Sequence, residues 1–550
     1  MSGPMSGEGN GTPSPLWRMA GQLVAVALFA AVLFAPTPSG LDPAGQRLAA
    51  VTVLMAVLWF TQALPIPATS LIPLAAFPLM GIQSAADVSR AYIDQNIFLF
   101  LGGFIIALGI ERWGLHRRMA LHVVRVIGTT PRLIVLGFMA ATAFLSMWIS
   151  NTACTLLMLP IGLALIASLE GLTEHRGQKP GVSEKPGFST SSPLTRFSMV
   201  LMLSIAYAAS IGGLTTLVGT PTNIAFVRIW DEAYPRDRFP DAPPISVGGW
   251  MSAVVPLGVV LLLAAWGLLT WRLQRIPGTE RLGRSFFTDR LRQLGRPRLG
   301  ELLMLLVFTA TAVLWITRTP LMLGPYELLP GWAAWTADAL AEWNVTADLL
   351  HDSTVAMGMA ILLFALPGGR DTEGRLMYLM DWKTAERLPW GILLLFGGGF
   401  AIAGAFTTTG LSEWLGGQFA AGLRDQPTWV LVAGTCLMLT FLSELTSNVA
   451  TVSAILPILV GATTAMDVDP RLILIPAAIS ASFGFMLPIA TPPNAIVFGT
   501  GRIRMGDMAR YGFALNLIAV ALLTIGTFVL LVPQFGIDMD QRPAWTIEKE

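Results

Sequence analysis

Charged residues are scarce in this chain. Only 13% of its 550 residues are Asp, Glu, Lys or Arg, whereas soluble domains contain about 25%. Hydrophobic residues make up 54% of the sequence, and the mean hydropathy is +0.64. Apolar runs that approach the roughly 20 residues needed by a membrane-crossing helix recur along the whole chain. This composition excludes a soluble globular protein and predicts an integral protein of the cell (inner) membrane, surrounded by the lipid bilayer.

Cysteine and net charge are also low. The two cysteines, Cys154 and Cys436, lie in apolar segments, which indicates small buried side chains and neither a disulfide framework nor a metal site. The net charge of +1 gives no general attraction for nucleic acid. The sequence has no His/Asp/Glu set suited to metal catalysis, no G-x-S-x-G and no Walker loop. We therefore expect neither an enzyme nor a cofactor.

The positive charges that are present predict an orientation. Eight arginines lie between Arg272 and Arg298, whereas the segment 319–352 contains no Lys or Arg. By the positive-inside rule the first segment is cytoplasmic and the second external. The chain then crosses the membrane about eleven times, with the N-terminus cytoplasmic and the C-terminus external. The apolar stretches 133–169 and 429–466 each begin and end on one side, so we predict two re-entrant hairpins that enter from opposite faces.

Three pairs of similar segments support an inverted repeat. SNTACTLLMLPI (150–161) resembles SNVATVSAILPI (447–458), and GTPTN (219–223) resembles ATPPN (490–494). Upstream of both pairs, LFLGGFIIALGIERWGL (99–115) resembles LLLFGGGFAIAGAFTTTGL (393–411). Each half thus contains a span, a hairpin with Ser-Asn at its tip, and a helix, 197–230 or 471–500, broken at Thr-Pro-x-Asn. Many secondary transporters are built this way and bind substrate and ions at the broken helices near the bilayer midplane. The predicted fold class is an all-α polytopic membrane protein with inverted repeats.

The two Ser-Asn pairs have two interpretations. They could only cap the second helix of each hairpin, or they could also bind a ligand. Two copies in mirrored hairpins, each paired with a helix break, favour ligand binding. Glu444 is the one acid near a tip, and it is a candidate either for function, as an intramembrane acid, or for a structural hydrogen bond to the hairpin backbone. A channel is a remote alternative, because channels seldom need two mirrored hairpins with polar tips.

These paired motifs resemble those of the divalent anion/sodium symporter family, and the similarity extends from about residue 20 to about residue 533. The resemblance implies a homodimer in which a scaffold domain holds the two protomers together and a transport domain with both hairpins moves as an elevator. It implies import of small anions, above all the dicarboxylates succinate, malate and fumarate, with sodium as the coupling ion. Other members of this family exchange anions without sodium or carry tricarboxylates or sulfate.

Under this resemblance the chain divides into six parts. They are a disordered N-terminal tail (1–17), scaffold helices (18–95), a first repeat core (96–247), scaffold helices and loops (248–388), a second repeat core (389–510), and a last span with an external tail (511–550).

The resemblance also implies the ligands. The first sodium site falls on Ser146, Ser150, Asn151 and the backbone at Gly219, and the second on Ser443, Thr446, Asn448 and the backbone at Ala490. The anion is then held between them by Asn151, Thr152, Thr220, Asn448 and Thr491, while Pro221 and Pro492 shape the loops. Two positions depart from the family pattern. Val449 stands where a threonine is usual and removes one hydroxyl from the anion site, which leaves the identity of the substrate open. Thr222 stands where a second proline is usual.

Overall fold

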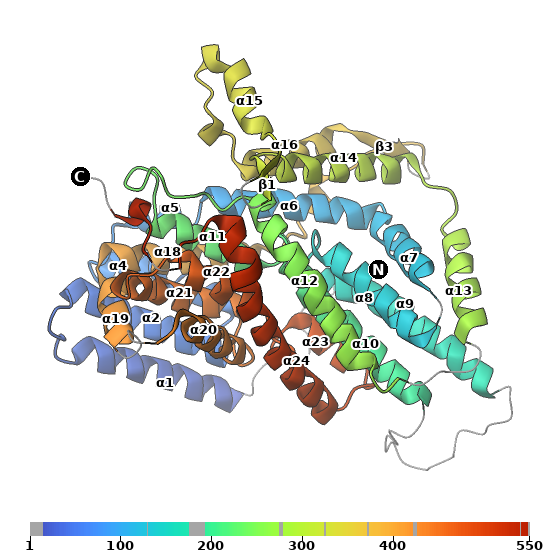
Figure 1. The fold of residues 1–550 in the computed structure, drawn as a ribbon, viewed down its shortest axis with the longest axis horizontal. Coiled ribbons are helices and arrows are strands. Elements are labelled where there is room, and N and C mark those ends of the chain that lie inside the picture. Colours follow the sequence, from blue (N-terminus) through green and yellow to red (C-terminus); the bar gives the residue numbers. More distant parts are fainter. Residues whose placement is uncertain are drawn as a thin grey trace.

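The computed structural model describes residues 15–128, 130–174, 193–273, 279–323, 326–370, 373–421, 426–539 and 541–547. Most of them are helical, as the sequence predicts (Figure 1). Residues 1–14, which make up most of the predicted tail, lie outside the described residues. The first helix begins at Pro15, inside the predicted tail 1–17.

The described residues up to 293 form thirteen helices. They are α1 (Pro15–Phe34), α2 (Pro43–Thr61), α3 (Ile66–Thr69), α4 (Ile72–Leu79), α5 (Ala85–Ala91), α6 (Gln95–Arg112), α7 (Leu115–Ile127), α8 (Pro131–Ser146), α9 (Asn151–Glu174), α10 (Pro193–Gly213), α11 (Pro221–Ala233), α12 (Val247–Thr270) and α13 (Thr279–Gln293) within the described residues.

The described residues from 299 onward form twelve more helices and two short β-ribbons. The helices are α14 (Leu299–Ile316), α15 (Trp332–Ala339), α16 (Asp352–Ala365), α17 (Trp382–Ala385), α18 (Trp390–Thr408), α19 (Leu411–Ala421), α20 (Thr428–Ser443), α21 (Asn448–Ala465), α22 (Arg471–Ser480), α23 (Pro492–Phe498), α24 (Met505–Gly526) and α25 (Val532–Phe535) within the described residues. A π-helical stretch, η3 (Thr527–Leu531), joins α24 to α25, and η1 (Ala341–Trp343), η2 (Ala347–Leu349) and η4 (Ala544–Thr546) are single 3-10 turns.

The β-ribbons depart from the all-α prediction. Strand β1 (Leu321–Leu323) pairs antiparallel with β2 (Tyr326–Leu329), and β3 (Pro367–Arg370) pairs antiparallel with β4 (Leu376–Tyr378). Both ribbons follow the C-terminal end of a hydrophobic helix, α14 or α16, where pairing between strands satisfies backbone groups outside the helices.

Two helices, α7 and α13, lie in segments that contain several arginines. Helix α7 buries Leu121 and Val124, three residues apart, against α8 and leaves Arg125 exposed. Helix α13 lies within the arginine-rich segment 272–298 and packs on α7 and α9. Spacing of three or four residues between apolar side chains places them on one face of a helix. The basic residues of α7 therefore belong to an amphipathic helix.

Ten helices of the described residues are long and apolar enough to cross a membrane. Two of these, α9 and α21, are the second arms of the predicted hairpins, whereas the segments 66–79, 352–365 and 471–480 are shorter apolar helices. Length and composition therefore establish an integral membrane protein, and the count of eleven spans with two re-entrant hairpins stays a prediction.

Each predicted hairpin is a pair of helices joined by four residues. Helices α8 and α9 are joined by residues 147–150 and pack on each other, and α20 and α21 are joined by residues 444–447 and do the same. Each predicted break is a non-helical segment between two helices, 214–220 between α10 and α11 and 481–491 between α22 and α23.

The two halves of the chain are interlocked at these elements. Helix α10 packs on α8 and α9 of its own half, and α23 of the other half packs on α9 and α10. In the same way α22 packs on α20 and α21, and α11 of the other half packs on α21 and α22. In Figure 1, α8, α9 and α10 lie on one side and α18 to α22 on the other, with α12 and α24 between them. Every hairpin thus has helices from both breaks beside it.

The first helices of the two breaks are the most enclosed. Every residue of α10 from Phe197 to Gly213 is buried, and so are all ten residues of α22. By contrast α1 buries only Gly21 and Ala25. A helix that is enclosed on all sides can carry polar side chains and a broken end at membrane depth, because protein surrounds it in place of lipid.

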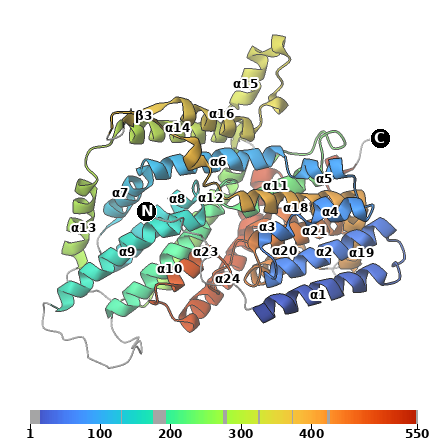
Figure 2. The same ribbon diagram turned by 180° about the vertical axis from the view of Figure 1, so that it is seen from behind.

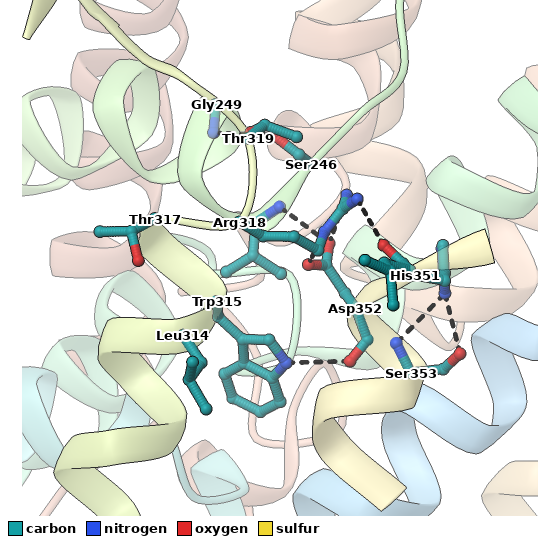
Figure 3. A network of polar contacts seen from close by, with 12 residues as sticks. Ser246, Gly249, Leu314, Trp315, Thr317, Arg318, Thr319, His351, Asp352 and Ser353 are labelled. Carbon is teal, nitrogen blue, oxygen red and sulfur yellow. Dashed lines mark hydrogen bonds and ion pairs between the residues drawn. The ribbon is translucent and has the colours of Figure 1, made fainter. Parts of the chain in front are cut away.

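A buried ion pair holds three other helices together. Arg318, just after α14, donates from Nε to Asp352 Oδ1 at 2.5 Å and from Nη2 to Oδ2 at 3.3 Å (Figure 3). The same carboxylate accepts from the backbone N–H of Val247 at the start of α12, and Trp315 Nε1 donates to the Asp352 carbonyl. Asp352 is 2% exposed. It therefore joins the starts of α12 and α16 to the end of α14.

Candidate functional site

The tip of the first hairpin is closed by a hydrogen bond between two predicted ligands. Ser146 ends α8, and its hydroxyl donates to Asn151 Oδ1 at 2.7 Å. Ser150 caps α9, because its Oγ accepts from the N–H of Ala153 at 3.3 Å. Thr152 follows in the first turn of α9 and is half-buried, as are Ser150 and Asn151. Capping of α9 thus explains Ser150. The amide of Asn151 has no capping role of this kind and is directed back toward Ser146.

At the first helix break, two glycines lie against this hairpin tip. A Cβ built on Gly219 would lie 2.5 Å from the carbonyl oxygen of Gly213 and 2.9 Å from that of Ser146. A Cβ on Gly213, the last residue of α10, would lie 2.2 Å from Asn151 Oδ1. Glycine is required at both positions because the backbone of the break and the hairpin tip are in close contact. Two carbonyl oxygens, one amide oxygen and one hydroxyl therefore gather around Ser146, Asn151, Gly213 and Gly219.

Thr216 and Asn223 hold the first break in shape. The Thr216 hydroxyl donates to the Met147 carbonyl of the tip at 2.5 Å and accepts from the N–H of Gly219 at 2.9 Å. Asn223 donates from Nδ2 to the carbonyls of Leu214 and Thr216. Thr220 is the buried N-cap residue of α11, and Pro221 is its first residue, where a proline costs no hydrogen bond.

The second break is built in the same way. Asn494 donates from Nδ2 to the carbonyls of Gly484 and Leu487 at 2.9 and 3.0 Å. Thr491 is the N-cap of α23, followed by Pro492, and its φ and ψ of −141° and 147° are close to the −137° and 139° of Thr220. The final asparagine of both Thr-Pro-x-Asn motifs therefore ties the broken segment to its own helix. Neither Asn223 nor Asn494 was among the predicted site residues, although the matched motifs contain both.

The side chains at the tip of the second hairpin form a different set of hydrogen bonds from those at the first tip. Ser443 is buried and donates to the Thr440 carbonyl one turn back, while Thr446 shares a 2.5 Å hydrogen bond with Thr451. The side chain of Ser447 does not cap α21. The buried Oδ1 of Asn448 has no hydrogen-bond partner among the described residues. The capping interpretation therefore fails for Ser447-Asn448.

Three further predicted residues differ in exposure. Val449 is 6% exposed and belongs to the hydrophobic core. Ala490 is buried and Pro492 is exposed. A Cβ on Gly484 would lie 3.1 Å from Cβ of Ala490, so the loop of the second break is folded closely on itself.

Glu444 has a structural hydrogen-bonding role. Its carboxylate accepts from the N–H groups of Met486 and Leu487 at 2.8 and 3.0 Å and from Asn516 Nδ2 at 2.7 Å. The side chain is 1% exposed. It connects the second hairpin tip to the second break and to α24. A structural hydrogen-bonding role for Glu444 is therefore supported, but the predicted partner was wrong, because the carboxylate bonds to the break and to α24 and not to the hairpin backbone.

Unpaired oxygens are concentrated at the two breaks and at the second tip. Six buried side-chain oxygens there have no hydrogen-bond partner within the described residues. They belong to Ser210, Thr222, Asn223, Asn448, Ser482 and Asn494. A buried polar atom without a partner is costly, so these six oxygens are candidate ligand atoms. The segments 143–152, 210–223, 440–452 and 480–494 contain no Lys or Arg, and oxygen atoms without nearby protein cations suit a hard metal ion.

A cavity lies away from the predicted site residues. It has a volume of about 700 Å³ and is lined by residues that include Asp87, Arg90, Arg228, Glu232 and Thr408. None of the predicted site residues lines it. Arg228 pairs there with Asp94 and Glu232. Its charged residues are already paired in part, and it is separate from the hairpin tips.

The fold and these paired tips define a polytopic membrane carrier, and comparison with known proteins identifies its family. The profile described as "Sodium:sulfate symporter transmembrane region" matches residues 16–532. The chain belongs to this family, as the paired motifs indicate.

Curated relatives match almost the whole chain. The sodium-dependent dicarboxylate transporter SdcS of Staphylococcus saprophyticus is 37% identical over 529 residues, covering 95% of this chain and 93% of the relative. SdcS of a Staphylococcus aureus strain is 37% identical over 534 residues, covering 96% and 94%. Among solved structures, the chain is similar to that of Neisseria gonorrhoeae MtrF, which is described as illuminating a class of antimetabolite efflux pumps. The TM-score is 0.50, and the identity is 15% over 96% of this chain and 97% of that chain. At this identity the likeness concerns the fold alone.

Proposed function

We propose that this protein is a sodium-coupled symporter that imports small divalent anions, above all four-carbon dicarboxylates such as succinate, malate and fumarate. Membership of the family and nearly full-length similarity to transporters named for sodium-dependent dicarboxylate transport support this proposal. In this function the protein is a carrier and not an enzyme, and sodium is the coupling ion.

The observation that carries the proposal is the chemistry of the two tips and breaks. They offer hydroxyl, amide and carbonyl oxygens, many without partners, and their segments contain no Lys or Arg. A divalent anion needs compensating positive charge when it leaves water. Two sodium ions held by these oxygens supply that charge beside the substrate. Binding of the anion then depends on binding of sodium, which is the basis of coupling.

The proposed first sodium site comprises Ser146, Ser150, Asn151 and the backbone at Gly219. A hydroxyl that donates its hydrogen, as Ser146 does to Asn151, keeps lone pairs for a cation.

The proposed second sodium site comprises Ser443, Thr446, Asn448 and the backbone at Ala490. Ser443 donates its hydrogen to a carbonyl of its own helix and so also keeps lone pairs, and the unpaired Oδ1 of Asn448 is available as a ligand.

The proposed anion site lies between the two sodium ions. Asn151 and Asn448 can each turn an amide oxygen to sodium and an amide N–H to the substrate. Thr152, Thr220 and Thr491 add hydroxyl donors, and the N-termini of the helices beyond the two breaks favour negative charge.

Three alternatives make different demands on this site. An exchanger without sodium needs protein cations beside the anion, and the lack of Lys and Arg in these segments argues against it. A tricarboxylate or sulfate carrier of the same family would use the same sodium sites with another anion. An anion channel would conduct without saturation and has no need for paired cation ligands.

The transport cycle that we propose follows the family pattern. Two protomers join through scaffold helices, and a transport unit carrying both hairpins moves relative to them as an elevator. The interlocked packing of α11 on α21 and of α23 on α9 supports movement of both hairpins as one body. The proposed orientation has a cytoplasmic N-terminus and an external C-terminus.

Uptake of labelled succinate into proteoliposomes, with and without an inward sodium gradient, tests this function. We expect saturable uptake that requires sodium. Uptake that is unchanged when potassium replaces sodium would refute coupling, and stronger competition by sulfate than by malate would identify a sulfate carrier.

Two variants connect the function to the tips. Asn151→Ala and Asn448→Ala should each lower the apparent affinity for sodium and for succinate together by about tenfold or more, since each strands buried polar groups at roughly 1–3 kcal/mol apiece. Normal transport by both variants would place the site elsewhere.

A further inference from the structure

A second cavity, of about 430 Å³, lies where the ends of three helices meet, far in sequence from the hairpin tips. It is lined by residues from the start of α10, the end of α12, and the segment that leads into α24. These are Thr195, Arg196, Met199, Leu268, Trp271, Arg272, Arg502, Arg504, Asp507, Arg510, Tyr511 and Ala514. Figures 1 and 2 show these three helix ends at the lower side of the molecule.

The lining is strongly basic, because five arginines accompany a single acid, Asp507. Arg502 is partly neutralised, since it donates to Glu170 at 2.8 Å and to Ser198 at 3.2 Å. Arg196 donates to the backbone carbonyl of Arg272 at 3.3 Å, which joins the start of α10 to the end of α12.

The N-terminus of α24 adds to this positive potential. Helix α24 begins at Met505, so its N-terminal N–H groups lie beside the arginines. The proposed sodium and anion sites do not use these arginines.

The surroundings of the cavity are apolar. Trp271, at the end of α12, is 78% exposed, and indole side chains at helix ends commonly lie at the level of lipid headgroups. Phe513 and Leu517 are exposed along α24, and Val260 and Leu263 are exposed along α12. A ligand with a negative head and apolar tails matches a basic cavity that continues into exposed apolar helix faces.

We propose that this cavity binds the phosphate of an anionic phospholipid, with the acyl chains lying along the exposed faces of α12 and α24. Arginine suits this role because its planar guanidinium group can donate two parallel hydrogen bonds to phosphate oxygens. Basic pockets between membrane helices on the cytoplasmic side are suited to such headgroups. The arginines of this cavity are predicted to face the cytoplasm by the positive-inside rule.

Lipid retention by the purified full-length chain tests the proposal. Protein in nonionic detergent is incubated with equal amounts of phosphatidylglycerol and phosphatidylcholine and then washed, and the bound lipids are quantified by mass spectrometry. We expect phosphatidylglycerol to be retained well above phosphatidylcholine. Equal retention of the two lipids would overturn the proposal.

Variants assign the binding to the cavity. Arg272 follows the end of α12, Arg510 lies in α24, and both are exposed, so Arg272→Gln with Arg510→Gln should preserve folding, which the thermal unfolding temperature checks. Phosphatidylglycerol should bind about 25-fold more weakly, because each arginine near an anionic headgroup contributes roughly fivefold. Lysine at both positions should keep much of the binding, since the charge remains. Retention by the double glutamine variant equal to that of the unmodified protein would refute the site.

A matched control and two competitors complete the test. Arg125→Gln with Arg387→Gln removes two exposed arginines outside the cavity and should leave lipid retention unchanged. Loss of retention equal to that of the cavity variant would mean that general surface charge is responsible. Inorganic phosphate and succinate, each added without lipid chains, should displace the lipid poorly. Complete displacement by either at equal concentration would show that the cavity takes a free anion, and the lipid proposal would fail while the transport function could still hold.

Discussion

Gly213→Ala adds one methyl group at the proposed first sodium site. The new Cβ would lie 2.2 Å from Asn151 Oδ1 and 3.0 Å from Cγ and Nδ2 of the same amide. Ordinary van der Waals contact begins at 3.4 Å, so the amide oxygen must retreat by about 1.2 Å. A shift of this size breaks the 2.7 Å hydrogen bond from Ser146 and withdraws the oxygen proposed to bind sodium.

The magnitude has two parts. Overpacking of a well-packed interior costs roughly 1–3 kcal/mol of stability. Loss of one polar contact to a charged group costs about 1.5–3 kcal/mol, which corresponds to a loss of roughly tenfold to a hundredfold in affinity for sodium. We expect the sodium concentration that gives half-maximal succinate uptake to rise by this factor. The thermal unfolding temperature should fall only modestly.

Two other glycines make matched comparisons in the same proteoliposome assay. Gly434 lies in α20 of the second hairpin and a Cβ there would meet nothing within 4 Å, so Gly434→Ala should leave sodium dependence unchanged. Gly484→Ala would place its Cβ 3.1 Å from Cβ of Ala490 and 3.2 Å from Cγ2 of Thr491, and an intermediate effect is expected.

The reasoning is refuted if folded, monodisperse Gly213→Ala protein has the sodium dependence of the unmodified chain. Ser146→Ala covers the case in which the glycine variant does not fold, because it removes a hydroxyl without adding volume. It should weaken sodium binding by a smaller factor, and normal sodium dependence in this variant would count equally against the first site.

Three further predictions concern other residues. Val449→Thr restores a hydroxyl next to Asn448 and should tighten dicarboxylate binding by about 0.5–1.5 kcal/mol, the net contribution of one hydrogen bond; unchanged succinate affinity would show that the missing hydroxyl does not set substrate preference. Glu444→Ala strands three buried donors at roughly 1–3 kcal/mol each, so the thermal unfolding temperature should fall markedly more than for Glu444→Gln, and equal temperatures for the two variants would contradict the structural role. Arg318→Ala leaves the Asp352 carboxylate buried without its ion-pair partner, and it should reduce stability by about 3–5 kcal/mol, the usual cost of breaking a buried pair. Thermal unfolding measures this loss, and the double variant Arg318→Met with Asp352→Leu should recover most of it. A negligible loss in Arg318→Ala would contradict a structural role for the ion pair.

The amino-acid sequence by itself determined the class of protein and the position of its main motifs. Long apolar runs and scarce charge are local signals that any membrane-crossing helix must show, and the helices appear near the expected residues. The Ser-Asn turns and the Thr-Pro-x-Asn breaks could be located because proline and capping residues act on the backbone within a few positions. The arginines of α7 give no sign of a helix, whereas the three-residue spacing of Leu121 and Val124 does.

The tertiary structure alone decided which of these motifs meet. Glu444 contacts backbone groups 42 and 43 residues away and an amide 72 residues away, and no local pattern specifies such partners. The need for glycine at 213 follows from the approach of Asn151, and the basic cavity forms from arginines on three separate segments. The packing of α11 on α21 and of α23 on α9 depends on how whole helices fit together in three dimensions. Spacing along the chain predicts what each segment becomes, whereas only the close packing of distant segments places their side chains beside one another.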